Sequence, residues 1–215
     1  AAVAGHMLAA HRSSPPGRQD RALALDAVAA LRAAADRAVA LHSPEQAIGF
    51  IEGALSITDD EAERAQLWEQ AAIAAQAAAH LKEAAAYARQ ALDWHTAHGD
   101  RSAVARTTVR LGAILAFGYE AEASIAVVKG AIEELAGDPA LRDDPWLAEL
   151  YAGMARSYLL AGRIGEAVDW SDRALADAER LGLQPVVAGA LASKGAAFLE
   201  EGRTTEGIGL LRTSL

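Results

Sequence analysis

The sequence predicts an all-α chain made of tandem helical hairpins. Hydrophobic residues make up 52% of the 215 residues but aromatic residues only 5%, and most of the apolar content is alanine. Alanine has the highest helix propensity and allows helices to approach closely. A motif of small residues also recurs along the chain. No segment shows the sustained alternation of apolar and polar residues that would indicate a strand.

Capping signals divide the chain into eleven predicted helices. Ser43 and Pro44 suit the N-cap and the first position of a helix, and Thr58 with Glu61 matches a capping box. Glycines after apolar-periodic segments are expected to form left-handed C-caps; these are Gly99, Gly137 and Gly182. The predicted helices span residues 3–12, 20–41, 44–57, 60–79, 81–98, 100–117, 120–136, 144–161, 164–181, 184–201 and 204–215.

The recurring motif places two small residues seven positions apart, after a segment with larger side chains. The first members of the pairs are Ala47, Ala84, Ser124, Ala167 and Gly207, which lie 37, 40, 43 and 40 residues apart. The second members are Ala54, Ala91, Ala131, Ala174 and Ser214. Such a period is typical of helical-hairpin repeats. Because one hairpin cannot bury both of its faces, neighbouring hairpins must stack.

The fullest copy of the motif runs from Tyr151 through Met154, Ala155, Tyr158, Gly162 and Ala167 to Ala174. On these residues the sequence resembles the tetratricopeptide repeat (TPR) family, over about residues 28–215. The resemblance implies a right-handed superhelix (an α-solenoid) of about five helix-turn-helix repeats plus an N-terminal helix. Residues 1–19 would be that helix and a linker from a preceding domain, and residues 20–215 the array, with units 28–60, 61–99, 100–138, 144–183 and 184–215. Two departures are the missing proline after most second helices and Lys194 at a usually apolar position.

A second resemblance concerns a larger architecture. Residues 6–12, Pro15-Pro16-Gly17, 31–38 and 55–60 are similar to the linker after the ATPase core of large bacterial signalling proteins. In these proteins, many of them actinobacterial, a nucleotide cyclase or a LuxR-type DNA-binding domain precedes or follows a STAND-type ATPase and helical repeats. The resemblance implies that this chain is the repeat region of such a protein. Since residues 207–215 lack a helix-ending signal, we also expect the chain to continue beyond Leu215. Gly5-His6-Met7 is interpreted as native sequence, with the remnant of an expression tag as the alternative.

Composition and missing motifs exclude several functions. The net charge of −9 disfavours nucleic acid and anionic membranes, which require clustered Lys and Arg. The absence of cysteine excludes disulfides and thiolate chemistry and fits a cytoplasmic location. The sequence has no uncharged run of about 18 apolar residues, so no membrane span is predicted. Because the chain contains no P-loop, dinucleotide fingerprint, zinc-protease motif or nucleophile elbow, we expect neither an enzyme nor a cofactor.

Two clusters have a functional alternative to their structural interpretation. His95 and His98, with Asp93 and Asp100 nearby, could bind zinc or simply form an exposed helix end. The tryptophans Trp68, Trp94, Trp146 and Trp170 could form a ligand cage. The simpler interpretation makes Trp68 a core anchor and places the other three between helices.

In TPR arrays the first helices of the repeats line a concave face, and the resemblance places a partner site there. The polar residues expected on it are Arg32, Asp36, Gln66, Glu69, Gln76, Arg106, Arg110, Glu149 and Arg156. They are accompanied by Ile73, Val109, Ala113, Ala152, Ala192 and Ala196.

Arg106, Arg110 and Arg156 either form a basic spot for an acidic peptide or a C-terminus, or Arg106 and Arg110 pair with Glu69 and Glu149. The predicted partner is a protein or peptide, which includes other domains of the same chain. Self-association through the ends of the stack is the second hypothesis, and a metal-dependent enzyme is the third.

Overall fold

The computed structural model describes residues 5, 6, 9 and 18–215, and within them the chain is helical without any strand. Most of the predicted helix over residues 3–12 therefore lies outside the described residues. The chain divides into two compact units, one ending at Trp94 and one beginning at His95, and each is described by itself.

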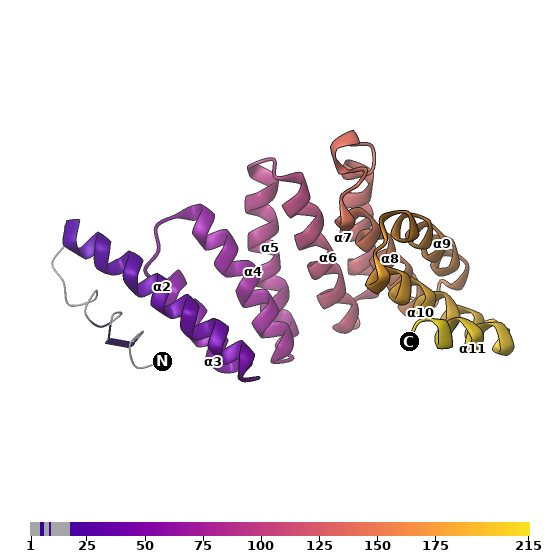
Figure 1. The fold of residues 1–215 in the computed structure, drawn as a ribbon, viewed down its shortest axis with the longest axis horizontal. Helices are drawn as coiled ribbons and strands as arrows, with labels where there is room; N and C mark the ends of the chain where they lie inside the picture. Colours follow the sequence, from indigo (N-terminus) through magenta and orange to yellow (C-terminus); the bar gives the residue numbers. More distant parts are fainter. Residues whose placement is uncertain (1–4, 7–8, 10–17) are drawn as a thin grey trace. The chain divides into compact units, whose positions relative to one another are not determined.

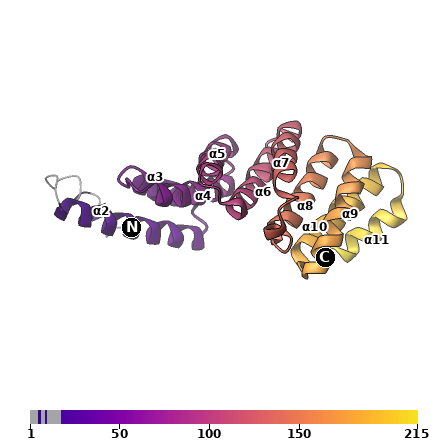
Figure 2. The same cartoon turned by 90° about the horizontal axis from the view of Figure 1, so that it is seen from above.

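The first unit contains two helical hairpins. Its helices are α2 (Arg18–Ala40), α3 (Pro44–Leu55), α4 (Glu61–Ala77) and the greater part of α5 (Leu81–Ala97). A short turn joins α2 to α3, and the two helices pack against each other side by side, as both views show (Figure 1, Figure 2). Helix α3 packs in turn against α4. All four helices begin and end within a few residues of the predicted bounds.

The second unit contains three further hairpins. Its helices are α6 (Arg101–Phe117), α7 (Ala121–Leu135), the short 3-10 helix η1 (Pro139–Leu141), α8 (Pro145–Leu160), α9 (Ile164–Leu181), α10 (Gln184–Glu200) and α11 (Thr204–Thr213). Each first helix packs against its own second helix, and α8 also contacts the first helices α6 and α10. The sequence did not predict η1, which its buried Leu141 anchors to the unit.

The turn between the two helices of each hairpin has the same backbone geometry in all five copies. The second residue after the end of the first helix is left-handed, with positive φ at His42, Ala79, Tyr119, Gly162 and Gly202. The amide after it donates to a carbonyl five residues back, as Arg163 N does to Tyr158 O at 2.9 Å. This is the Schellman arrangement that satisfies the last carbonyls of a helix. Each left-handed residue precedes the first small residue of the motif by five positions, so turn and motif share one period.

All small residues of the motif are buried except Ser214, which is half-buried. Ala47, Ala84, Ser124 and Ala167 are fully buried, and so are Ala54, Ala91 and Ala174. At the last hairpin, a Cβ placed on Gly207 would lie 2.8 Å from the Gly195 carbonyl oxygen. A Cβ on Gly112 would lie 2.6 Å from Val128 Cγ2. A methyl group at Gly207 would therefore collide with the backbone of the opposite helix, and one at Gly112 would require the Val128 side chain to move.

Buried serines add hydrogen bonds to this packing in the second unit. The Oγ atoms of Ser124 on α7 and Ser157 on α8 lie 2.7 Å apart. Ser124 Oγ is also 2.8 Å from the Gly112 carbonyl on α6, and Ser157 Oγ is 2.8 Å from the Gly153 carbonyl. The pair thus links three helices through groups that would be costly to bury without partners.

The structure corrects the predicted capping box. Asp60, not Thr58, is the N-cap of α4, because its carboxylate accepts from the amides of Ala62 and Glu63 at 2.9 and 3.2 Å. The Thr58 hydroxyl donates instead to Glu63 Oε2 at 3.1 Å. The helix therefore starts at Glu61, with its acidic residues in the first turn, where the helix dipole favours them.

Of the three glycines expected as left-handed C-caps, Gly99 and Gly182 have positive φ but Gly137 does not. Helix α7 ends at Leu135, and the chain passes directly into η1, which the Asp138 side chain caps by accepting from Ala140 N at 2.9 Å. Lys194, the polar departure from the TPR pattern, forms an ion pair with Asp172 of α9 and lies 5.7 Å from the centroid of the Phe198 ring. Its charge is therefore paired at the edge of the hairpin.

The turn geometry predicts opposite effects of two substitutions. Tyr119→Gly should stabilise the protein by about 0.5–1 kcal/mol, because a left-handed L-residue is strained and this side chain is 98% exposed, so that little packing is lost. Gly162→Ala should destabilise it by about 1 kcal/mol, although a Cβ there meets nothing within 4 Å. Thermal unfolding of both variants measures the effects.

The control for this pair is Gly130→Ala in α7, where a Cβ also meets nothing within 4 Å and φ is not positive. It should stabilise the protein by about 0.5–1 kcal/mol, since alanine is the better residue in a helix interior. If Gly162→Ala raised the unfolding temperature as Gly130→Ala does, the left-handed conformation of Gly162 would be contradicted.

Candidate functional site

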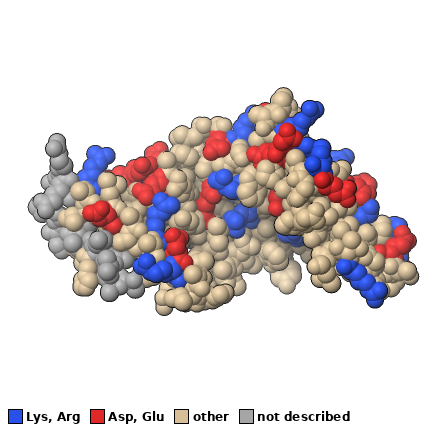
Figure 3. Space-filling view, viewed as in Figure 1, with Lys and Arg blue, Asp and Glu red and all other residues tan. Residues whose placement is uncertain are grey.

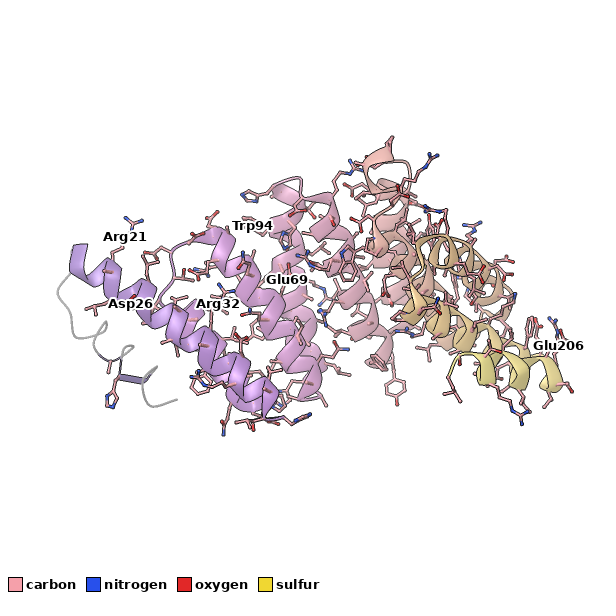
Figure 4. The ribbon with its side chains drawn as sticks, in the orientation of Figure 1. Arg21, Asp26, Arg32, Glu69, Trp94 and Glu206 are labelled. Carbon is pink, nitrogen blue, oxygen red and sulfur yellow. The ribbon has the colours of Figure 1, made fainter. Side chains whose placement is uncertain are left out.

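In the first unit the structure brings part of the predicted face together. Arg32 on α2 reaches α4, where its Nη2 lies 3.4 Å from Gln66 Oε1 and its Nη1 lies 3.4 Å from Glu63 Oε1. Glu63 was missing from the predicted set. Glu69 lies further along α4, and Figure 4 labels both Arg32 and Glu69 on their helices.

The remaining predicted residues of this unit lie along the same two helices. Asp36 is exposed one turn after Arg32, and Gln76 is half-buried near the end of α4. Ile73 is exposed on α4. The Arg32 interactions are long and partly exposed, and such surface pairs contribute little to stability. These side chains are thus held loosely enough to be rearranged by a partner.

In the second unit, Glu149 and Arg156 share one face of α8. They are seven residues apart, which is two helical turns or about 10 Å along the axis. Between them Gly153 leaves a shallow pocket of about 30 Å³, which Val109 and Ala113 of α6 also line. This volume accommodates a methyl-sized group. The pocket lies where α6 packs against α8.

Arg156 extends from α8 toward α10. A Cβ placed on Gly189 of α10 would lie 3.9 Å from Arg156 Nη2, so the missing side chain leaves room for the guanidinium against the helix. Within the described part of this unit, neither Glu149 nor Arg156 forms an ion pair or a side-chain hydrogen bond. Both charges are therefore available on a half-buried surface.

Burial raises the pKa of Glu149 above its usual value, and the nearby positive charge of Arg156 opposes this shift only in part. A half-buried carboxylate in a pocket, with a raised pKa and a cation nearby, is a candidate functional group. Glu149 can accept an N–H donor, and Arg156 can donate to a carboxylate or carbonyl. The structure thus places opposite charges at the two ends of a pocket.

Arg106 and Arg110 are half-buried on α6, the helix next to this pocket. Neither is a free cation, because each takes part in an interaction within the chain. Ala192 and Ala196 are half-buried on α10. Arg156 is therefore the arginine of the predicted basic spot on which a site can be built.

The zinc alternative and the tryptophan prediction can be compared with the structure. His95 is buried whereas His98 is exposed, so the two side chains do not share one exposed face, as a frayed helix end would require. Among the described residues, no group of three His, Asp or Glu side chains is arranged to hold a metal ion.

Trp68 is not the predicted core anchor, because it is half-buried and lines an open pocket with Trp94.

A further pocket of about 750 Å³ lies where η1 meets α8 and α9. Its Arg180 is already paired, with Nη1 2.7 Å from Asp143 Oδ1 and Nη2 3.2 Å from Asp177 Oδ1. Asp138 is likewise paired, with Arg101 Nε at 2.8 Å. These ion pairs hold the η1 segment in place. The charged side chains of this pocket therefore have structural partners, and no ligand is needed to explain them.

None of the described helices is both long enough and apolar enough to span a membrane. No sequence model of a protein family matches this chain, and no curated protein matches it by sequence.

Solved structures, in contrast, are similar to it in fold. BtubC (BKLC) from P. vanneervenii superposes with a TM-score of 0.70 at 16% sequence identity, over 99% of this chain and 87% of that one. A putative kinesin light chain from Podosopora anserina with nearly identical TPR-like repeats gives 0.68 at 17% identity, over 87% of this chain and 92% of that one.

A Rap protein in complex with competence and sporulation factor is a third similar structure. It superposes with a TM-score of 0.69 at 19% identity, and the match covers 98% of this chain but 57% of the Rap protein. At identities this low, the similarities establish the fold alone. They confirm the prediction of an all-α, TPR-like helical-repeat fold.

The raised pKa of Glu149 predicts a pH-dependent stability. The native state binds the Glu149 proton more tightly than the unfolded state does, so this group contributes stability at low pH that is lost as pH rises through its native pKa. Glu149→Gln should therefore raise the unfolding temperature at pH 7 by about 1–2 °C. The difference from the wild type should shrink as the pH falls toward 4.

Thermal unfolding of both proteins between pH 4 and pH 8 measures this difference. Glu179→Gln, at an exposed position of α9, is the matched control and should follow the wild type at every pH. A difference between E149Q and the wild type that stays constant with pH would contradict the desolvation of Glu149.

Proposed function

We propose that this chain is a protein-interaction module that binds an extended peptide on the first helices of its repeats. In the second unit the binding groups would be Glu149 and Arg156. The observation that carries the proposal is the desolvated Glu149 carboxylate, which shares a face with Arg156 without pairing with it. An empty, half-buried pair of opposite charges is destabilising by itself, and a ligand that engages both offsets this cost.

The spacing of the two charges suits a peptide. About 10 Å of helix separates them, which is close to the length of three extended residues. The small residues between them, Gly153 and Ala113, allow a peptide backbone to approach α6 and α8. Arg156 would bind a carboxylate with two parallel hydrogen bonds, and Glu149 would accept a backbone N–H or a cationic group. An acidic peptide or a free C-terminus is therefore the favoured partner.

The similarity to the Rap protein supports a binding function, because that protein was solved in complex with competence and sporulation factor. The first unit would have a binding surface of its own, made of Arg32, Asp36, Gln66, Glu69 and Gln76. Since Arg32 only loosely engages Gln66 and Glu63, a partner can replace these contacts at little cost. In this function the chain binds and does not catalyse.

We propose further that the chain is the repeat region of a larger bacterial signalling ATPase in the cytoplasm. The support is the similarity of residues 6–12 and 55–60 to the linkers of such proteins. The flanking coding sequence tests this directly: an ATPase core with a nucleotide cyclase or a LuxR-type domain is expected. Flanking sequence without an ATPase would refute it.

Selection from a displayed library of random peptides tests the binding site. Selected peptides should carry a carboxylate, and Arg156→Ala should weaken their binding by at least tenfold, because a charge-assisted hydrogen bond contributes about 1.5–3 kcal/mol. Isothermal titration calorimetry of the purified variants gives the dissociation constants.

Arg173→Ala is the matched control, since Arg173 lies on the second helix α9, where its guanidinium carbon is 4.4 Å from the centroid of the Trp170 ring. Its binding should stay within twofold of the wild type. If R173A and R156A lost equal affinity for the peptides, or if R156A bound them as the wild type does, Arg156 would not be part of the binding site.

A further inference from the structure

A pocket in the first unit has the walls of a cation site. It has a volume of about 540 Å³ and lies between the start of α4 and the last part of α5. Two half-buried indoles, Trp68 on α4 and Trp94 on α5, form its aromatic walls. Figure 4 labels Trp94 on its helix. The face of an indole carries negative charge density and attracts cations more strongly than any other side-chain ring.

The charged groups around the pocket are mostly negative. Three exposed carboxylates line it: Asp59 in the loop before α4, Glu61 on α4 and Asp93 on α5. One arginine, Arg64 of α4, also lines it. Three negative charges and one positive charge leave a net charge of −2. Figure 3 shows acidic side chains gathered over the start of α4. Within the described part of the chain, none of the three carboxylates forms an ion pair or a side-chain hydrogen bond.

The neighbouring acidic residues already have structural roles, which separates them from this set. Asp60 caps α4, and Glu63 accepts hydrogen bonds from Thr58 and Arg32. Helix capping and internal pairing therefore do not account for Asp59 and Asp93. Their charges line the pocket, and Arg64 is the cation among its lining residues.

An internal contact shows that the Trp68 ring attracts a cation. The guanidinium carbon of Arg64 lies 5.4 Å from the centroid of this ring, within the range of a cation–π interaction. One face of the indole is thus already used in this way. The pocket remains open beside it, with Trp94 and the three carboxylates on its other sides.

We propose that this pocket binds an alkylammonium group. Indole walls favour the methyl or methylene groups of such a cation, and carboxylates at the edge supply its counter-charge. A neutral apolar group would gain only the first interaction, and a metal ion would gain only the second. The site lies in a different unit from the proposed peptide site at Glu149 and Arg156, so either can fail without affecting the other.

Choline and its neutral isostere 3,3-dimethylbutanol are the matched probes, because they differ only in the charge of the central atom. Each is titrated into the 15N-labelled protein at constant ionic strength, and the indole N–H resonances are followed by NMR. Choline should shift the signals of Trp68 and Trp94 but not those of Trp146 and Trp170. It should bind at least ten times more tightly than the neutral isostere.

Asp59→Asn and Asp93→Asn should each weaken choline binding by at least threefold. Asp169→Asn, on the exposed surface of α9, is the matched control and should leave it unchanged. Because all three positions are exposed, the variants should retain the wild-type spectrum outside the pocket.

A peptide with a central trimethyllysine, compared with the same peptide with norleucine, distinguishes a protein-borne ammonium from a free one. Tighter binding of this peptide than of choline would identify a side chain as the source, and the reverse order would identify a small molecule. Equal shifts by choline and 3,3-dimethylbutanol, or shifts that D59N and D93N leave unchanged, would overturn the proposal.

Discussion

Where the two helices of a hairpin cross, only hydrogen, a methyl group or a hydroxymethyl group lies between their backbones. This close contact is the constraint on which the rest of the structure depends. At Gly207 and Gly112 even a methyl group would overlap the opposite helix. Since alanine and glycine bury little apolar area each, the helices gain stability by approaching closely and by stacking hairpin on hairpin. The left-handed turn five residues before each small residue sets the register at which the helices meet.

The same constraint determines where polar groups can lie. Small residues fill the hairpin interiors, and larger polar side chains are placed on the outer faces of the helices. On α8 this arrangement leaves Glu149 and Arg156 half-buried at the two ends of a pocket that Gly153 keeps open. In the first unit it leaves Trp68 of α4 beside an open pocket with acidic residues at its edge. In both units the candidate sites are formed by large polar and aromatic side chains that do not fit between the closely packed helices.

The sequence was sufficient for the helices because they depend on local signals. Helix propensity, helix-ending residues and the recurrence from Ala47 to Gly207 predicted every α-helix in residues 18–215 within a few residues of its bounds. Errors occurred where two local signals compete. Thr58 and Asp60 are both N-cap residues, and only the path of the loop shows that Asp60 accepts the amides. Gly137 has the composition of a C-cap, but the chain turns into η1 instead.

The candidate sites show the boundary between sequence and structure. The sequence by itself determined that the chain forms helical hairpins with small residues inside them, because this follows from the 3.6-residue period and from residue size. Only the tertiary structure decided that Glu149 is desolvated beside an unpaired Arg156, and that Trp68 and Trp94 wall the same pocket. These properties depend on the distances between side chains of different helices, and no local pattern in the sequence encodes those distances.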